Sequence, residues 1–304
     1  MRDPTYARGP CGGGHGGRSP GCGRWTGRCH RGVRPLFLGR RIVLRSAWIL
    51  GVGGLLTLWY AGRVLLLSLS RNPGALCRSC DSLTRRWSRA LLKLAGVSVQ
   101  IEGVENLPVD EAFIIIANHE SWFDVWALAG FLPIDARFAA KKELERIPIF
   151  GRAWRACGHI SIDRSDHASA IESMTQAGLQ IKEQSLNMVF FAEGTRCPDG
   201  TLQPFKKGPF VIAIEGGVSM VPVGMVGARA IMPKGSFRMR RGNIGVRVGE
   251  PISVAGMEHA DRDRLRDTVW DAVARLRGGE GRTSRLPGEP PLDDVPEPSK
   301  SNPS

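Results

Sequence analysis

Aromatic residues are scarce in this chain, which has only two tyrosines and 7% aromatic residues among its 304 residues. Single-stranded nucleic acids bind largely by stacking on such side chains, so little material exists for that kind of surface. The net charge of +13 is also unevenly spread, because residues 1–45 hold ten arginines, no lysine and one acidic residue, Asp3. These residues carry +9 of the total, and the other 259 carry +4. We therefore predict no nucleic acid partner.

A regular cysteine pattern is also missing. The seven cysteines are an odd number, scattered from position 11 to position 197. Disulfide frameworks are typical of even numbers in short secreted domains, so this pattern favours a reducing compartment. Cys77 and Cys80 form a CxxC pair, but no second pair stands at zinc-binding spacing. We predict no metal site.

The two ends of the chain have little apolar material. Residues 1–41 are rich in glycine and arginine, and residues 279–304 contain six prolines. Such segments cannot bury enough apolar surface to offset the entropy of ordering, so we predict a disordered extension and a disordered tail. A tether to an anionic surface is the alternative for the first.

Charged residues are absent from Ser46 to Gly62, a run of 17 residues. As an α-helix this run extends roughly 26 Å, slightly less than a bilayer core of about 30 Å. Arginines on both sides give no orientation, so a spanning helix and a helix lying in one leaflet both fit. A second, basic amphipathic helix is expected over 83–96, and its apolar face could contact the core or, as we favour, the membrane. We predict that residues 42–96 are membrane-associated.

From Val97 to position 278 the pattern is that of an α/β domain, with short β-branched runs alternating with helical stretches. The predicted strands are Val97–Glu102, Ala112–Ala117, Arg137–Ala140, His159–Asp163, Asn187–Phe191, Met220–Val223 and Gly245–Val248. The predicted helices are Trp122–Phe131, His167–Glu183, Phe205–Glu215 and Asp261–Arg277.

A buried strand leads directly into the polar residues Asn118 and His119. In α/β folds, clefts form at the carboxyl ends of strands. Asp124 follows five residues after His119, so the two can meet only if His119 precedes a helix and Asp124 lies in its first turn. Ser121 is a plausible N-cap for that helix. The same Ser-x-x-Asp pattern is a capping box, which would explain Asp124 without catalysis, and both interpretations can hold together.

A second polar cluster, Glu193-Gly194-Thr195-Arg196, also follows a buried strand. Gly194 permits a tight turn, and an arginine can bind phosphate through two hydrogen bonds. Lys206 and Lys207 follow near a predicted helix start, which also favours anions. Solvated basic loops are the alternative interpretation of each cluster.

These motifs, with three further blocks, occur in the order found in the glycerolipid acyltransferase family. Within it the chain most resembles 1-acyl-sn-glycerol-3-phosphate acyltransferases, over about residues 83–250. It departs from the family pattern at Ala192, usually proline, and Cys197, commonly serine, which bears on acceptor preference rather than on acyl transfer. The blocks are Asn118-His119-x4-Asp124, Lys141–Leu144 with Ile147–Gly151, Ile162-Asp163-Arg164, Phe191–Arg196 and Val221-Pro222-Val223.

The resemblance implies a mixed central sheet flanked by helices and a membrane-bound enzyme. It would move a fatty acyl group from acyl-CoA or acyl-carrier protein to the hydroxyl of a lysophospholipid, most simply 1-acyl-sn-glycerol 3-phosphate, with no bound cofactor. We expect the active site at the cytoplasmic face of the inner membrane.

The same resemblance implies roles for individual residues. His119 would be the general base and Asp124 would hold its other ring nitrogen. Arg196 is the first choice for the acceptor phosphate, and Glu193 would orient Arg196 or contact the glycerol. The weaker phosphate candidates are Arg164, Lys141 and Lys207.

Two alternatives remain at this stage. Within the family, the acceptor could be glycerol 3-phosphate or a lyso-ornithine lipid. In another class, the chain could be a non-catalytic membrane adaptor that holds anionic lipid through its arginine-rich N-terminus.

Overall fold

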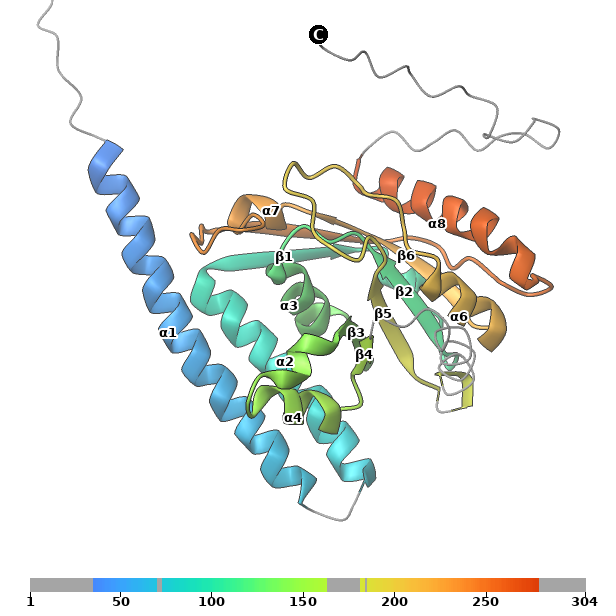
Figure 1. Ribbon diagram of the computed structural model, residues 1–304, viewed down its shortest axis with the longest axis horizontal. Coiled ribbons are helices and arrows are strands. Elements are labelled where there is room, and N and C mark those ends of the chain that lie inside the picture. Colours follow the sequence, from blue (N-terminus) through green and yellow to red (C-terminus); the bar gives the residue numbers. More distant parts are fainter. Residues whose placement is uncertain (1–34, 70–72, 163–180, 184, 279–304) are drawn as a thin grey trace, which may run out of the picture.

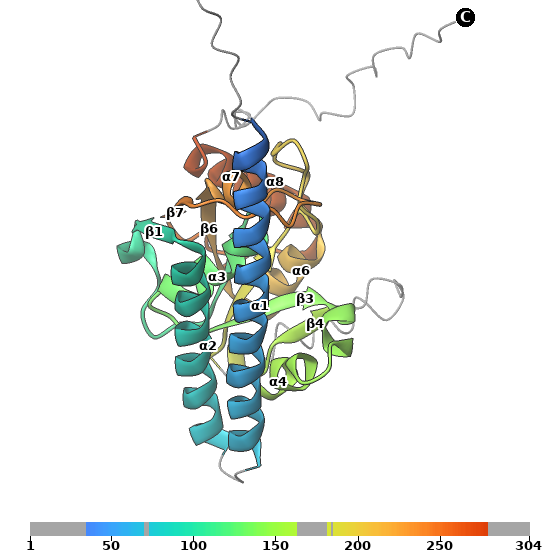
Figure 2. The same ribbon diagram turned by 90° about the vertical axis from the view of Figure 1, so that its left-hand side faces the viewer.

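The computed structural model describes residues 35–69, 73–162, 181–183 and 185–278. Two long helices, α1 (Pro35–Ser68) and α2 (Pro73–Ala95), stand side by side against an α/β domain (Figures 1 and 2). Helix α1 begins at Pro35, so the end of the extension predicted as disordered is helical. Proline is well suited to a first helical position, because it has no N–H to leave unpaired there.

Seven strands form one sheet in the order β1-β7-β6-β2-β5-β3-β4. Only β6 and β7 pair antiparallel, and the other neighbours are parallel, so the predicted mixed sheet is confirmed. The strands are β1 (Val97–Glu102), β2 (Phe113–Ala117), β3 (Ala136–Lys141), β4 (Ile160–Ile162), β5 (Asn187–Phe191), β6 (Ser219–Val226) and β7 (Gly242–Val248).

Strand β2 lies at the middle of the sheet and is buried on both faces. Its alternate residues Phe113, Ile115 and Ala117 pack into one apolar core, and Ile114 and Ile116 pack into the other. This follows from the period of two along a strand. A central strand with two buried faces reads as a continuous apolar run, and its carboxyl end delivers the following polar residues to one edge of the sheet.

Helices cover both faces of the sheet (Figure 1). Helix α3 (Trp122–Phe131) and α7 (Ala228–Ile231) pack on the face that α2 also covers, and α6 (Gly208–Gly216) and α8 (Arg262–Leu276) pack on the opposite face. Helix α4 (Phe150–Ala156) packs against α1 and was not predicted. The short 3₁₀ segments are Val104–Asn106, Lys142–Arg146 and His259–Asp261.

Helix α1 contains the apolar segment Ile42–Ser68, which is long and apolar enough to cross a membrane. Only one stripe of the helix is buried, through residues such as Ile49, Ala61 and Val64. Its other faces leave large apolar side chains in solvent, at Val43, Leu44, Trp48, Leu50, Leu55, Leu58, Trp59 and Leu66. An exposed apolar surface of this length indicates contact with another apolar phase.

The structure corrects the prediction that the apolar face of the helix over 83–96, now part of α2, contacts the membrane. Leu91 and Ala95 are buried, at 5% and 0% exposed, and Trp87 packs edge-on against Trp126 of α3. This face therefore contacts the core and not the membrane. Sequence periodicity shows that a helix has an apolar face, but it does not show which neighbour covers that face.

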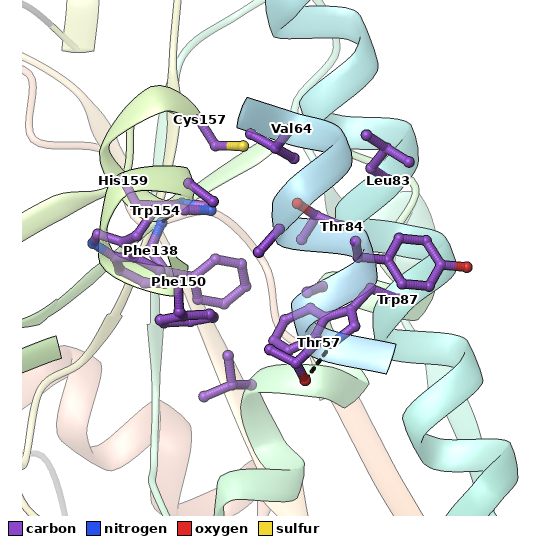
Figure 3. A pocket seen from close by; sticks show the side chains of 15 residues that line it. Thr57, Val64, Leu83, Thr84, Trp87, Phe138, Phe150, Trp154, Cys157 and His159 are labelled. Carbon is purple, nitrogen blue, oxygen red and sulfur yellow. Dashed lines mark hydrogen bonds between the residues drawn. The ribbon is translucent and has the colours of Figure 1, made fainter. Parts of the chain in front are cut away.

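Two further contacts tie α2 to the α/β domain. Cys80 forms a disulfide with Cys157 at the end of α4, which the prediction of a reducing compartment did not anticipate. The carboxylate of Asp81 pairs with the buried guanidinium of Arg137 on β3. Beside them, α1, α2, α3 and α4 enclose an apolar pocket, in which the indole N–H of Trp87 donates to Thr57 Oγ1 at 3.1 Å (Figure 3).

Most predicted elements are present, and the bounds of most of them are as predicted or differ by a few residues, although α2 begins ten residues before the predicted start at 83. The predicted helix His167–Glu183 falls largely outside the described residues, which resume with helical residues at 181–183. The tail predicted at 279–304 and residues 1–34 of the extension also lie outside them.

Candidate active site

Asn118 continues the β2–β6 pairing beyond the end of β2. Its side-chain amide donates to the carbonyl of Met225 at 2.9 Å and accepts from the N–H of Met225 at 2.7 Å. The Asn118 side chain is 1% exposed, so these bonds satisfy a buried polar group. The next residue, His119, therefore starts from a fixed point at the carboxyl edge of the sheet.

His119 and Asp124 meet, as the turn between them allows. Nδ1 of His119 lies 3.0 Å from Oδ2 of Asp124, whose side chain is completely buried. The same oxygen accepts the backbone N–H groups of Glu120 at 2.6 Å and Ser121 at 2.7 Å. Ser121 is the N-cap of α3 and Asp124 is its N3 residue, so the capping box is present as well. Asp124 both closes the helix start and orients the imidazole.

The ring of His119 is held on two sides. It stacks on Phe191 at the end of β5, with ring centroids 4.2 Å apart and planes inclined by 26°. With Nδ1 turned to a carboxylate, the neutral ring carries its proton on Nδ1 and leaves Nε2 as the acceptor. The side chain is 16% exposed. A substrate can therefore reach a histidine whose orientation is already set.

Glu193 was predicted to orient Arg196 or to contact the glycerol of the acceptor, and the structure shows both of its oxygens bound to backbone N–H groups. Its Oε1 accepts the backbone N–H of His119 at 2.8 Å, and its Oε2 accepts the N–H of Gln203 at 2.8 Å. Burial raises the pKa of this carboxyl, and the two N–H donors partly offset that rise. Glu193 thus fixes the histidine backbone instead of orienting Arg196. Gly194 follows at φ 73°, a left-handed conformation that turns the chain directly after the carboxylate.

Glu120 is a third buried carboxylate beside His119, and the sequence analysis missed it. Its Oε1 accepts from the guanidinium of Arg277 at 3.1 Å, and Oε2 accepts the N–H of Arg229 at 3.3 Å. Burial raises the pKa of Glu120, and the negative charge of Asp124 raises it further. Arg277 also donates to the carbonyl of Gly200 at 2.8 Å, so it joins the two loops that carry the candidate residues.

Arg196 is the predicted cation that the structure places next to residues 118–121, which connect β2 to α3 and which we call the histidine loop. Its guanidinium lies 5.4 Å from the centre of the Trp122 ring, at the first residue of α3. Partial burial lowers the pKa of Arg196, and the charge of Asp124 opposes that shift. Beside it, Lys234 Nζ lies 3.3 Å from Thr195 Oγ1. Lys234 was missed because it lies on a distant loop with no motif of its own.

The other predicted cations are not gathered there. Lys207 pairs with Asp263 of α8 at 3.0 Å. Lys141 is exposed at the end of β3, which is separated from β2 by β5. Arg164 lies outside the described residues. Among those residues, no group of three or more histidine, cysteine or acidic side chains could hold a metal ion.

The arrangement provides the oriented imidazole of His119, the buried carboxylate of Asp124 behind it, and the guanidinium of Arg196. These residues belong to the loop cluster, by which we mean the segments that follow β2, β5 and β6 at the carboxyl edge of the sheet. Such a set can remove a proton from a hydroxyl group while binding an anionic group of the same molecule.

Comparisons with known proteins show which proteins this chain resembles. Residues 98–226 match the protein-family model described as Acyltransferase. A crystal structure of the 1-acyl-sn-glycerophosphate acyltransferase PlsC from Thermotoga maritima superimposes with a TM-score of 0.67 and 28% sequence identity. The match covers 79% of this chain and 96% of that one.

Two curated relatives have the same kind of name. The 1-acyl-sn-glycerol-3-phosphate acyltransferase of Limnanthes alba is 38% identical over 160 residues, which are 53% of this chain and 56% of that protein. The human 1-acyl-sn-glycerol-3-phosphate acyltransferase alpha is 29% identical over 241 residues, covering 76% of this chain and 85% of that protein. The chain spans little more than half the length of the plant relatives that it matches.

Proposed function

We propose that this chain, whose residues 98–226 match the Acyltransferase family model and whose fold matches that of PlsC, transfers a fatty acyl group to the free hydroxyl of 1-acyl-sn-glycerol 3-phosphate, giving phosphatidic acid. The observation that carries this proposal is the 3.0 Å contact between His119 Nδ1 and the buried carboxylate of Asp124. The names of the relatives support the choice of acceptor. The donor is a thioester of coenzyme A or of acyl-carrier protein, and no bound cofactor is needed.

His119 acts as the general base. Its Nε2 takes the proton of the acceptor hydroxyl as that oxygen attacks the thioester carbonyl, and Asp124 stabilises the imidazolium that forms. The new ester C–O bond forms and the C–S bond breaks. The thiol that leaves has a reference pKa of about 8.5, so its expulsion needs little acid assistance. The proton on His119 then passes to the thiolate, and no acyl-enzyme is required.

The backbone N–H of Trp122, at the start of α3, supports the developing oxyanion. The first N–H groups of a helix have no partner within the helix and point towards its N-terminal end. Trp122 is the first residue of α3 and directly follows the histidine loop. Donors in this place act on the charge that exists only in the transition state.

The acceptor phosphate is held by Arg196, together with Lys234, which contacts the neighbouring residue Thr195. Both side chains belong to the loop cluster at the carboxyl edge of the sheet. A guanidinium can form two parallel bonds with a phosphate, whereas the ammonium acts as a point charge. Together they favour a phosphate monoester over an acceptor without a negative charge.

The exposed apolar side chains of α1 indicate membrane association. We further propose that the active site faces the cytoplasm. The partners are then the bilayer, a lysophospholipid and the acyl thioester.

The test is a panel of acceptors given to the full chain with one acyl-CoA and, separately, one acyl-carrier-protein thioester. We expect the highest kcat/KM with 1-acyl-sn-glycerol 3-phosphate and lower values with glycerol 3-phosphate and lyso-ornithine lipid. A preference for either of the last two would replace the acceptor but keep acyl transfer. Lipid binding without turnover of any thioester would contradict the enzyme and support a membrane adaptor.

A further inference from the structure

The segment between α7 and β7 contains an unbalanced group of positive charges. We call residues Pro233–Arg241 the basic loop. Its cations are all exposed, and no acidic residue occurs between Gly227 and Gly249. The cations are Lys234, Arg238, Arg240 and Arg241. Such a loop is attracted to a surface with many negative charges.

Phe237 lies in the middle of these cations and is 74% exposed. A phenylalanine left in water contributes almost nothing to the stability of the fold, because apolar stabilisation scales with the area buried. An aromatic ring flanked by basic side chains matches the boundary of an anionic bilayer, where the ring enters the acyl region and the cations remain at the headgroups.

The basic loop is held in place and does not hang free. The N–H of Arg238 donates to Ser236 Oγ at 3.1 Å, and the N–H of Arg240 donates to the carbonyl of Ile231 at 2.9 Å. Met239, between them, is buried at 4% exposed. The backbone therefore presents Phe237 outwards while it turns Met239 into the core.

Helix α1 forms the other side of this anchor. The N–H of Met239 donates to Ser46 Oγ at 2.8 Å, and its carbonyl accepts from the guanidinium of Arg45 at 3.0 Å. The loop consequently lies against the first half of α1, as Figure 1 shows for the segment that follows α7. In the same turns of α1, Leu44 and Trp48 are 62% and 59% exposed. Apolar helix surface, exposed phenylalanine and cations are thus part of one continuous structure.

We propose that the basic loop is a second membrane-contacting element, in which Phe237 enters the interface and the arginines bind the phosphates of anionic lipid headgroups. This goes beyond the proposed function, which assigns membrane contact to α1 alone. One end of the loop reaches the candidate active site, because Lys234 contacts Thr195. Contact through the loop therefore sets the distance between that site and the lipid headgroups.

Hydrogen–deuterium exchange of the full chain tests this without any substrate. The protein is mixed with vesicles of phosphatidylcholine alone or with added phosphatidylglycerol, and flotation shows whether it is bound. We expect peptides covering 233–241 to exchange more slowly on the anionic vesicles than on the neutral ones, and the affinity for anionic vesicles to rise by about fivefold for each basic residue engaged. Because no acyl transfer is measured, the result is independent of the proposed function.

Variants at exposed positions separate charge from apolar contact. Arg238→Gln with Arg240→Gln should remove most of the loop's protection on anionic vesicles, and Phe237→Ser should reduce the protection. The matched controls are Arg275→Gln, exposed on α8 at the opposite face of the sheet, and Val109→Ser, at a side chain that is 80% exposed. Both controls should keep the protection of the wild type.

Several results would overturn the proposal. One is a bound protein whose loop exchanges as fast as in free solution, and another is equal protection on neutral vesicles. The proposal would also be overturned if the protein floated with neither kind of vesicle. It would be overturned as well if the double arginine variant kept the protection of the loop. Equal protection by heparin, unaffected by Phe237→Ser, would point to an acidic macromolecule and not to a bilayer.

Discussion

Oε1 of Glu193 accepts the backbone N–H of His119 at 2.8 Å, across 74 residues of sequence. The two residues follow β5 and β2, which are neighbours in the sheet. The bond places the loop of one strand directly on the loop of the other. The motif suggests that Glu193 contacts the substrate, but in the structure its carboxylate positions His119.

Glu193→Gln tests that positioning role. An amide has only one oxygen, so one of the two N–H groups bound by Glu193 would face an NH₂ group and lose its partner, at a cost of about 1–3 kcal/mol. We expect kcat to fall by at least about tenfold, since a base displaced slightly from its substrate is a poor catalyst. The KM for the acceptor should change little. An unchanged kcat, or a large rise of KM alone, would assign Glu193 to substrate binding instead.

His119→Ala should remove the base and lower kcat by about 10²–10⁴-fold, the usual contribution of general base catalysis. The matched control is His259→Ala, because His259 pairs with Glu215 on the surface and takes no part in the site. Steady-state acyl transfer and thermal unfolding should be measured for both. Full activity of a folded His119→Ala protein would remove histidine from the mechanism.

Arg196→Ala should raise the KM for 1-acyl-sn-glycerol 3-phosphate by roughly tenfold or more, because a charge-assisted bond to phosphate contributes about 1.5–3 kcal/mol. An uncharged monoacylglycerol acceptor provides the comparison. The kcat/KM for this uncharged acceptor should be low and should barely change in the Arg196→Ala variant. Equal losses for both acceptors would show that Arg196 supports the loop and does not bind phosphate.

The disulfide between Cys80 and Cys157 should stabilise the attachment of α2 to α4. It closes a loop with a sequence separation of 77, and loop-closure entropy then predicts about 4 kcal/mol of stability. We expect Cys157→Ala, or reduction of the wild type, to lower the free energy of unfolding by up to this amount. Cys197→Ser is the control, since Cys197 is a free cysteine. Equal unfolding curves with and without a reducing agent would contradict the prediction.

His159 should make the protein less stable in acid. Burial, and then the charge of Arg137, lower its pKa to about 3, and its Nδ1 accepts the N–H of Phe138 at 3.1 Å. The unfolded chain has a histidine pKa of about 6.5, so between these values only the unfolded state binds the proton. Stability is therefore unaffected above pH 6.5 and falls by at most about 1.4 kcal/mol per pH unit below it.

His159→Asn isolates this effect, because an asparagine oxygen can still accept the Phe138 N–H but does not titrate. Urea unfolding at a series of pH values from neutral to mildly acidic should give a shallower loss of stability for the variant. The same slope in both proteins would show that other groups govern the acid response.

Local signals in the sequence were sufficient to predict many of the helices and strands. Strands Val97–Glu102 and Asn187–Phe191 and the helix Trp122–Phe131 have the predicted bounds. Each is specified by neighbours along the chain, through β-branched runs or the Ser121–Asp124 capping box. The meeting of His119 and Asp124 belongs to the same class, since the two are five residues apart and the helix start between them sets their geometry.

Only the tertiary structure decided the remaining relationships, because they join residues far apart in the chain. Glu193 reaches His119, Arg277 reaches Glu120 across 157 residues, and Lys234 reaches Thr195. The order of strands in the sheet creates these contacts, and residue spacing carries no record of it. For the same reason the chain's pattern revealed that α2 has an apolar face, while packing against α3 and α1 determined that this face is buried in the core.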